Sequence, residues 1–467
     1  MSLFSILHSG SSAMAAHNSA LQTTSNNVAN AETVGYARQS TTFTASGTQR
    51  RGGLLMGQGV SASTVTASYD RFAQGQVFSR MGTAGYGTAQ AGDFRAIETI
   101  FAEGSEGGLG QAMTDFLDSF SALEAAPSDP WVRLDVLARA ETVTSYMNQQ
   151  ASDLVARRAE ADEAVIPLVQ RASVLGAQVG ALNEDIQRLE AGGGHANDLR
   201  AQRTALLEEL ATLGSTTVQD EADGTVTVLF GGHSLVEGST ARTLSVGQDA
   251  TTGFNTVRIS QGTSTLNITS ALQGGGAIGS AIQTRDVTTT NLLGQLDELA
   301  FTLADEVNTV HVAGFGLDGL GSRNFFATPS AQAGAALNLS LDSNVLGNPD
   351  AIAASSSAAT VPGGNANATA LAALGQAAVL SNGTRTFGQF YAGVVSGVGQ
   401  DASSAYSLEA RSELQLGSAM DLRDAASGVS LEEEALDLIR FREAYSAATR
   451  VVSTANEMLD ELMAIVG

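Results

Sequence analysis

Two glycine-rich stretches carry the residue spacing that comes nearest to a chemical motif. Both fit the pattern G-x-G-x-x-G, in which glycines let the backbone approach the phosphates of a dinucleotide. The first is formed by Gly274, Gly276 and Gly279, and the second by Gly314, Gly316 and Gly319. Asp297 follows the first at a suggestive distance, but it falls in a helical stripe and not at a strand end, where an acid would reach the ribose. Because the chain has 51 glycines, chance matches are expected. We therefore expect no cofactor and no cofactor-binding residues.

Histidine, acidic and hydroxyl side chains form no catalytic or metal-ligating pattern. The five histidines include no pair at helical ligand spacing; they are His8, His17, His195, His233 and His311. The run from Asp318 to Asn324 lacks the glycine and the final glutamate of a calcium loop. Val236 stands where a nucleophile elbow beginning at Gly232 would need glycine. Adjacent carboxylates such as Glu208 and Glu209 are typical of a solvated helix face. We therefore expect no catalytic residue, no metal site and no enzyme activity.

The composition excludes further classes of chemistry. The 24 cationic side chains are all arginine and cysteine is absent, so Schiff-base lysines and thiolate sites are excluded. A net charge of −24 argues against nucleic acid binding, because that affinity comes largely from cationic groups that displace phosphate counterions. The N-terminus lacks the pattern of a secretory signal, and no stretch approaches 18 apolar residues, so we expect no membrane insertion.

The elements that must position any functional surface are long helices at both ends of the chain. Near the N-terminus, Leu7, Met14, Leu21 and Val28 recur every seven residues, which is typical of a helical stripe that packs on another helix. Residues 1–31 contain no Asp, Glu, Lys or Arg. Such a helix has no surface ion pairs and a narrow apolar face, so we expect it to be ordered mainly against partners.

The C-terminal region has the sharper seven-residue repeat. Its two lines of residues are Leu431, Leu438, Tyr445, Val452, Leu459 and Val466, and, three positions later, Phe441, Ala448, Ala455 and Leu462. Ser430 and Glu433 form a capping box, which predicts that the helix begins at Leu431. The two stripes could be ordinary core packing within one bundle. Their terminal position and the uncharged first helix favour the alternative, burial inside a polymer of many subunits.

Between the terminal helices, the sequence predicts a helical hairpin followed by a region of strands. Apolar residues spaced by three and four from Val165 to Leu189, a break at Gly192–Gly194 and a second series from Leu199 to Leu213 predict an antiparallel helical hairpin. Residues 216–270 alternate at period two between glycine-containing turns, which predicts strands. We predict a mainly α fold with a smaller β part. Its parts are a terminal coiled-coil assembly domain (1–50 plus 425–467), an elongated helical bundle in the middle (51–215 plus 271–424) and an inserted β-rich outer domain (216–270).

The run from Ser25 to Gln39 resembles the signature shared by bacterial flagellar rod, hook and hook-associated axial proteins. The residues that carry it are Asn26, Asn27, Asn30, Thr33, Gly35, Tyr36 and Arg38. Their chemistry is consistent with a helix stop. Asn side chains bond backbone groups at a helix end, Gly35 permits a turn, and Tyr36 with Arg38 begins an extended segment.

The C-terminal entry Ser427-Gly428-Val429 and the helix that follows resemble the hook-associated protein 1 family of the hook–filament junction. Interior stretches agree, among them Arg285-Asp286 and residues 304–308 and 386–391. The resemblance covers most of the chain. It departs at residues 216–270 and around residue 320, which leaves open the number and shape of the outer domains.

The resemblance implies a structural protein, exported through the flagellar type III apparatus without cleavage and assembled as a ring between hook and filament. The implied partners are further copies of the chain, hook protein, the second hook–filament junction protein, and a cytosolic export chaperone on the C-terminal helix. Its implied place is the extracellular flagellum. Three alternatives stay open: a hook or rod protein with the same N-terminal signature, an enzyme acting on cell-wall polymer, and a membrane-inserting translocator, which the lack of a long apolar segment disfavours.

Overall fold

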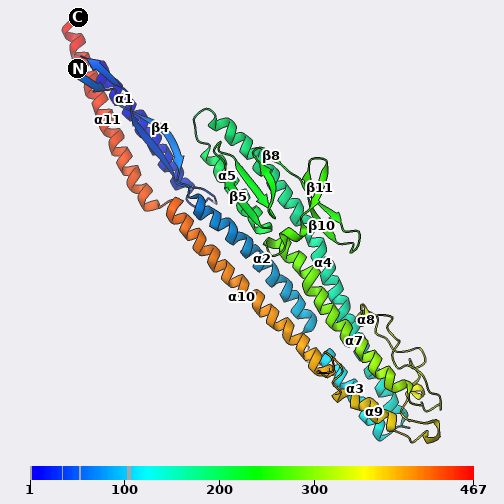
Figure 1. Ribbon diagram of the computed structural model, residues 1–467. Coiled ribbons are helices and arrows are strands. Elements are labelled where there is room, and N and C mark those ends of the chain that lie inside the picture. Colours follow the sequence, from blue (N-terminus) through cyan, green and yellow to red (C-terminus); the bar gives the residue numbers. More distant parts are fainter. Residues whose placement is uncertain (1–2, 34, 52–53, 103–106, 467) are drawn as a thin grey trace. The chain divides into compact units, whose positions relative to one another are not determined.

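The computed structural model describes residues 3–33, 35–51, 54–102 and 107–466. The fold is mainly α with a smaller β part, long helices at both ends and a central helical region, which confirms the predicted fold class (Figure 1). The chain divides into two compact units. Unit 1 comprises Met1–Tyr86, Pro167–Ile278 and Arg411–Gly467, and unit 2 comprises Gly87–Ile166 and Gly279–Ala410. Three long helices contribute residues to both units: α2 (Arg71–Phe101), α4 (Pro130–Glu190) and α10 (Phe387–Ser427).

In unit 1 the first and last helices pair with each other. Helix α1 (Leu3–Ala29) runs antiparallel to α11 (Leu431–Val466), and both chain ends lie at one end of this pair in Figure 1. Small residues let the helices approach closely. A Cβ atom added at Gly10 would lie 2.7 Å from Cγ2 of Val452, and Ala20 is fully buried. The uncharged sequence of α1 is thus explained in part by a neighbour within the same chain.

Two β-hairpins accompany α1, in a region for which the sequence predicts an extended segment beginning at Tyr36 and Arg38 but no named strand. Strands β1 (Gln39–Ala45) and β4 (Val60–Ala67) pair antiparallel with a register shift between Thr42 and Phe43. Strands β2 (Thr48–Arg51) and β3 (Leu54–Gly57) form a smaller hairpin between them. Residues 39–45 and 60–67 are rich in Thr, Ser and Val, which suit half-buried strands, and α1 covers β1 and β4. Strand structure is therefore not confined to residues 216–270.

The rest of unit 1 confirms the helical hairpin and the predicted strand region. The end of α4 and α5 (Asn197–Leu213) are joined by the glycine turn, where Gly193 has a φ of +85°. A four-stranded antiparallel sheet has the order β5-β6-β7-β8, and a three-stranded one has the order β11-β10-β9. Their bounds are β5 (Thr216–Asp220), β6 (Val226–Phe230), β7 (His233–Glu237), β8 (Thr240–Ala241), β9 (Leu244–Gln248), β10 (Asn255–Gln261) and β11 (Ser264–Asn267). Asn183 of α4 is fully buried and bonds the backbone of Val226 and Gly238, so it ties α4 to the first of these sheets.

Unit 2 is built around aromatic side chains. The rings of Phe116, Phe120, Phe325 and Phe326 lie with centroids 5.0–5.9 Å apart. They belong to a core formed by α3 (Leu109–Ala125), α7 (Thr289–Val312), α8 (Ala335–Asn338), α9 (Ala366–Ala373) and parts of α2, α4 and α10. Helix α6 (Gly276–Gln283) precedes α7. The remaining short turns are η1 (Thr269–Leu272), η2 (Thr284–Thr288), η3 (Pro349–Ala351), η4 (Ala358–Thr360) and η5 (Leu374–Gln376).

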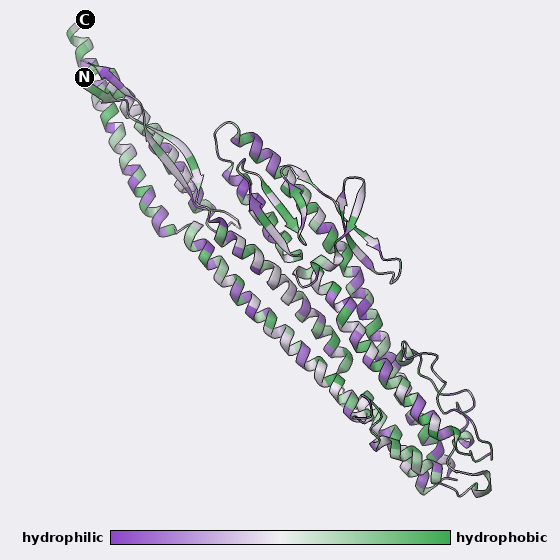
Figure 2. Ribbon diagram, viewed as in Figure 1, coloured by the Kyte–Doolittle hydropathy of each residue, from purple (hydrophilic) through white to green (hydrophobic). Residues whose placement is uncertain are grey.

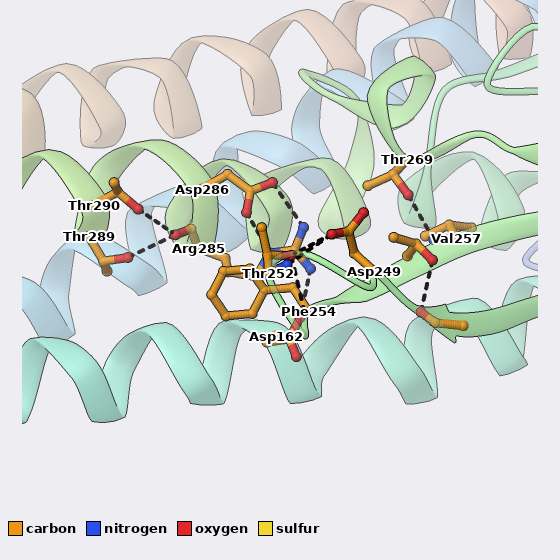
Figure 3. A network of polar contacts seen from close by, with 12 residues as sticks. Asp162, Asp249, Thr252, Phe254, Val257, Thr269, Arg285, Asp286, Thr289 and Thr290 are labelled. Carbon is orange, nitrogen blue, oxygen red and sulfur yellow. Dashed lines mark hydrogen bonds and ion pairs between the residues drawn. The ribbon is translucent and has the colours of Figure 1, made fainter.

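A buried arginine stands at the wide π-type turn η2 between α6 and α7. The Arg285 side chain is 3% exposed, and its Nη1 lies 2.6 Å from Oδ1 of Asp162 on α4. Its Nε lies 2.7 Å from Oδ1 of Asp286 (Figure 3). The carbonyl of Arg285 accepts hydrogen bonds from the hydroxyls of Thr289 and Thr290. Arg285-Asp286, one of the stretches that resemble the family, therefore stabilises the junction between α6 and α7.

A buried histidine fixes the long loop after α7. His311 is 1% exposed, its Nε2 accepts a hydrogen bond from the backbone N–H of Ala353, and its Nδ1 donates to the carbonyl of Arg323. Burial, the largest cause, lowers the pKa of His311 to about 4. The imidazole is therefore neutral in the folded chain at pH values where an unfolded chain protonates it.

We expect unit 2 to lose stability in mild acid because of His311. Since the folded pKa lies below the unfolded value of 6.5, stability is present above pH 6.5 and is lost as the pH falls toward 4. The loss between pH 7 and pH 5 is about 2 kcal/mol. Amide exchange of α7 in wild type and in His311→Gln, which keeps a donor and an acceptor but does not titrate, measures this difference. An equal loss in both proteins would contradict the prediction.

Candidate assembly site

The predicted seam residues lie on the paired terminal helices but are only partly covered. Leu7, Met14 and Leu21 of α1 are half-buried, and Val28 is 40% exposed. On α11 the half-buried residues are Leu438, Phe441, Tyr445, Val452 and Leu459, while Leu431 and Leu462 are exposed. The side chain of Val466 lies outside the described residues. The apolar residues buried between the two helices are alanines, namely Ala16, Ala20, Ala448 and Ala455.

A cluster of hydrogen bonds joins the signature to the start of α11, and we call it the clasp. It consists of Asn27, Tyr36, Arg38, Gln39 and Glu434. Asn27 is 1% exposed, and its Oδ1 accepts from the Gln39 N–H and the Tyr36 hydroxyl, both at 2.9 Å. Its Nδ2 donates to the Gln39 carbonyl at 2.8 Å and to Oε2 of Glu434 at 2.9 Å. One buried amide therefore bonds the segment after α1 and the first turns of α11.

Arg38 supplies the charged half of the clasp. Its Nε lies 2.6 Å from Oε1 of Glu434, whose side chain is 2% exposed. Its other nitrogens lie 3.1 Å from Glu433 and 3.3 Å from Asp437, and its backbone N–H donates to the Ser427 carbonyl at 2.8 Å. The hydrogen bond to Glu434 is the largest cause that raises the pKa of Arg38. Burial, with Asp198 and Glu434 nearby, raises the pKa of Tyr36 to about 12, so the phenol remains a donor at neutral pH.

The other signature residues shape the turn that presents the clasp. Asn30 Nδ2 donates to the Asn26 carbonyl at 3.0 Å, and Thr33 N–H donates to the Asn30 carbonyl. These bonds end α1, as the sequence predicts. Gly35 has a φ of +78°, and a Cβ atom there would lie 2.7 Å from the Ala201 carbonyl oxygen of α5. A side chain at position 35 would therefore be strained and would also strike α5. Val34, within the quoted run, lies outside the described residues.

The C-terminal entry motif, Ser427-Gly428-Val429, lies next to the clasp. Ser427 is buried and offers its carbonyl to Arg38. The N–H of Gly428 bonds the Asp424 carbonyl at 2.7 Å, and a Cβ atom at Gly428 would lie only 2.5 Å from that oxygen. Val429 is half-buried, and the Ser430 hydroxyl accepts the Glu433 N–H at 3.4 Å, which is one of the two bonds of the predicted capping box. Helix α11 begins at Leu431, as predicted. The break between α10 and α11 thus sets where Glu434 stands.

A cavity of about 320 Å³ lies beside the clasp within unit 1. It is lined by residues 35–37 and 39, the end of β4, α5, β5 and β6. Its charged walls are compensated by the chain itself, since Arg200 pairs with Glu190 at 2.7 Å and Arg423 pairs with buried Glu208 at 2.8 Å. Burial lowers the pKa of Arg203 to about 10. Arg200, Arg203 and Arg423 therefore line the same cavity as residues 35–37 and 39.

The stretches considered for chemistry have structural environments in the described residues. The first glycine stretch follows the turn η1, and the second follows α7, so neither begins after a strand as a dinucleotide site does. Gly314 is tightly packed, because a Cβ atom there would lie 2.3 Å from Nδ2 of Asn367. Among the described residues, no group of three or more His, Asp or Glu is placed to hold a metal ion.

Helix α4 differs from the expectation that the chain has no long apolar segment. By length and composition alone it could cross a membrane. Of its apolar residues, Val165, Val169, Leu175 and Val179 are fully buried, whereas Val155, Val174 and Leu189 are exposed.

Sequence reasoning does not find Glu434 or Gln39 as members of the clasp. In the sequence, Glu432, Glu433 and Glu434 cannot be told apart, because each is a negative charge that favours a helix N-terminus. Only the fold shows that the third of them is buried against Asn27 and Arg38, 407 and 396 residues away along the chain.

Comparison with known proteins relates three segments of the chain to flagellar families. The profile of the flagellar hook-associated protein FlgK helical domain matches residues 94–326. The profile of the flagella basal body rod protein matches residues 7–36, and that of the flagellar basal body rod FlgEFG protein C-terminal matches residues 424–465.

Individual relatives agree over nearly the full length. Flagellar hook-associated protein 1 of Bacillus subtilis (strain 168) is 27% identical over 99% of this chain and 98% of its own length. That of Escherichia coli (strain K12) is 25% identical over 99% of this chain and 100% of its own length. The solved structure of the flagellar hook junction protein FlgK from Burkholderia pseudomallei is 16% identical and has a TM-score of 0.66. It covers 76% of this chain and 100% of its own, so the two share a fold.

Proposed function

Because the chain belongs to the family of flagellar hook-associated proteins, we propose that it is a structural axial protein that forms the junction between hook and filament. Family membership places it in the flagellum with other flagellar components as partners. The finer proposal is that the chain is exported through the flagellar type III apparatus, assembles as a ring, and contacts hook protein on one side and the second junction protein on the other.

The observation that carries this proposal is the uncovered apolar face of α11. Val451, Met458 and Ile465 recur every seven residues and are 46%, 47% and 82% exposed. Hydrophobic and hydrophilic residues alternate along α11 in Figure 2. Within one chain, α1 partly covers the face of α11 that it contacts, but Val451, Met458 and Ile465 stay exposed to water. Exposed apolar surface costs free energy, and contact with further subunits would remove that cost. The predicted contacts Val28, Leu431 and Leu462, also exposed, belong to the same proposed interface.

We propose that the chain is organised in three domains. Residues 1–50 and 425–467 form the assembly domain, residues 51–215 and 271–424 the helical middle, and residues 216–270 an outer β-rich part. An export chaperone would cover the stripe from Leu431 to Val466 before secretion, together with the exposed line of Val451, Met458 and Ile465 beside it.

The proposal includes the absence of catalysis. An enzyme of the cell wall needs two carboxylates across a cleft, one protonated and one ionised. The buried Glu208 and Glu434 instead pair with arginines, at 2.8 and 2.6 Å. Purified chain incubated with isolated cell wall is expected to release no soluble fragments, and steady release would favour the enzymatic alternative.

Deletion of the gene in the source bacterium is the direct test of the junction function. We expect electron micrographs to show hooks without filaments, and the culture medium to contain unassembled filament subunits. A plasmid copy of the intact gene is the control and should restore filaments. Filaments of normal number and length in the deletion strain would contradict the proposal, and missing hooks would point to a rod or hook protein instead.

A further inference from the structure

A histidine lies within a ring cluster that joins three elements of the terminal unit. His17 of α1 lies 5.6 Å from Phe43 of β1 and 6.4 Å from Phe441 of α11, measured between ring centroids. Phe43 and Phe441 are themselves 6.0 Å apart. The cluster therefore connects α1, the hairpin beside it and α11 at a single point.

The surroundings of His17 do not support a second proton. Its Nδ1 is buried and has no hydrogen-bond partner among the described residues. Residues 1–31 and strands β1 and β4 contain no ionisable side chain apart from His8 and His17. Protonation would create a buried N–H without an acceptor and a charge in apolar surroundings, and both cost free energy.

The charged groups that face the cluster come from α11, and they are already paired. Arg440 lies over the Phe441 ring at 4.7 Å and pairs with Asp437 at 3.2 Å, and Asp437 also pairs with Arg38. Arg442 pairs with Glu443 at 3.4 Å. Among the described residues, Asp437 and Glu443 of this part of α11 already pair with arginines, so neither is a free counter-ion for an imidazolium at His17.

Attraction between an imidazolium and the two phenylalanine rings acts in the opposite direction. Such cation–π contacts are weak at partly exposed sites. Arg440 already occupies the Phe441 ring, and both His17 pairs are tilted, at 54° and 33°. Burial outweighs this attraction and lowers the pKa of His17 below its usual 6.5.

We propose that His17 is a pH-sensitive element of the terminal unit, whose protonation loosens α1 from β1 and α11. The sign follows from linkage. A histidine whose folded pKa is lowered contributes stability that is present above pH 6.5 and is lost as the pH falls through the folded value. Its role in the flagellum rests on the proposed function, since α1 and α11 are the proposed assembly surface. The pH response itself is a property of the purified chain.

Two measurements on the full-length chain test the proposal. The first is an NMR titration of histidine side chains between pH 8 and pH 4.5, with the His17 signal identified by its absence in His17→Phe. The second is amide exchange of α1 at pH 7.5 and pH 5.5, expressed as protection relative to the unstructured chain. We expect a His17 pKa below 6.5 and a loss of α1 protection at pH 5.5 of at most about tenfold, the limit set by the unfolded value.

Matched variants separate this residue from general acid effects. His17→Phe keeps an aromatic ring and does not titrate, so its α1 protection should not change with pH. His8→Asn changes an exposed histidine on the same helix and should behave as wild type. A His17 pKa at or above 6.5, or an undiminished pH response in His17→Phe, would overturn the proposal. If His17→Phe does not fold, His17→Gln identifies the signal and the wild-type pKa decides. None of these outcomes depends on whether the deletion strain lacks filaments.

Discussion

Cells that carry Leu438→Glu together with Leu459→Glu are expected to be non-motile and to bear hooks without filaments. Both leucines are half-buried on the line of α11 that faces α1, and they are 21 residues apart. A glutamate at either half-buried position loses part of its hydration, and the cost reaches several kcal/mol for a fully desolvated charge. Electron microscopy and swimming assays in the deletion strain measure the result.

Controls distinguish a failed seam from a generally damaged chain. Leu320→Glu with Leu346→Glu adds the same charge at positions of unit 2 that are 60% and 58% exposed, and should preserve filaments. Circular dichroism of the purified seam variant should show that most of the helix remains, because unit 2 does not include α1 or α11. The variant's presence in the culture medium would show that export continues. Normal filaments in cells with the Leu438→Glu, Leu459→Glu variant would contradict the proposal that the terminal stripes are the assembly surface.

Glu434→Ala is expected to destabilise the pairing of α1 with α11 by about 3 kcal/mol. Removal of one partner of a buried ion pair leaves the other without compensation and typically costs 3–5 kcal/mol, and we take the lower end because the Arg38 side chain is 29% exposed. Asn27, 1% exposed, would also lose the acceptor of one hydrogen bond. The opening free energy of α1, obtained from amide exchange, measures the loss.

The neighbours of Glu434 provide matched controls. Glu432→Ala removes an exposed carboxylate from the same helix turn and should change stability by no more than about 0.5 kcal/mol. Glu434→Gln keeps an acceptor for Arg38 or Asn27 and should lie between the two. If Glu434→Ala and Glu432→Ala behaved alike, the clasp would contribute nothing to the terminal unit.

Local sequence signals predicted the elements whose causes are local. The box of Ser430 and Glu433 predicted the start of α11, and the three glycines from Gly192 predicted the turn between α4 and α5. The period-two alternation in residues 216–270 predicted strands, and β6 at Val226–Phe230 is one of those that the structure contains. Backbone capping, glycine freedom and alternating burial act within a few residues, so the sequence reveals them directly.

Strands β1 and β4 were harder to predict because their sequence is mostly polar. The alternation in residues 39–45 runs over Ser and Thr, and only Phe43 is a large apolar residue. Their burial comes from α1, which lies on β1 and β4, and from each other. A strand stabilised by cross-strand pairs and by a distant helix gives a weak signal in its own residues.

The amino-acid sequence by itself determined the terminal heptads, the signature turn, the lack of metal-site and nucleophile patterns, and the resemblance to flagellar axial proteins, since these depend on residue type and on spacing along the chain. The tertiary structure alone decided which acid meets Arg38, why Asn27 is buried, and which apolar residues of α11 stay uncovered. Those facts depend on contacts between residues some 400 positions apart. Spacing along the chain carries no information about such contacts, because burial is set by whichever element folds against a side chain.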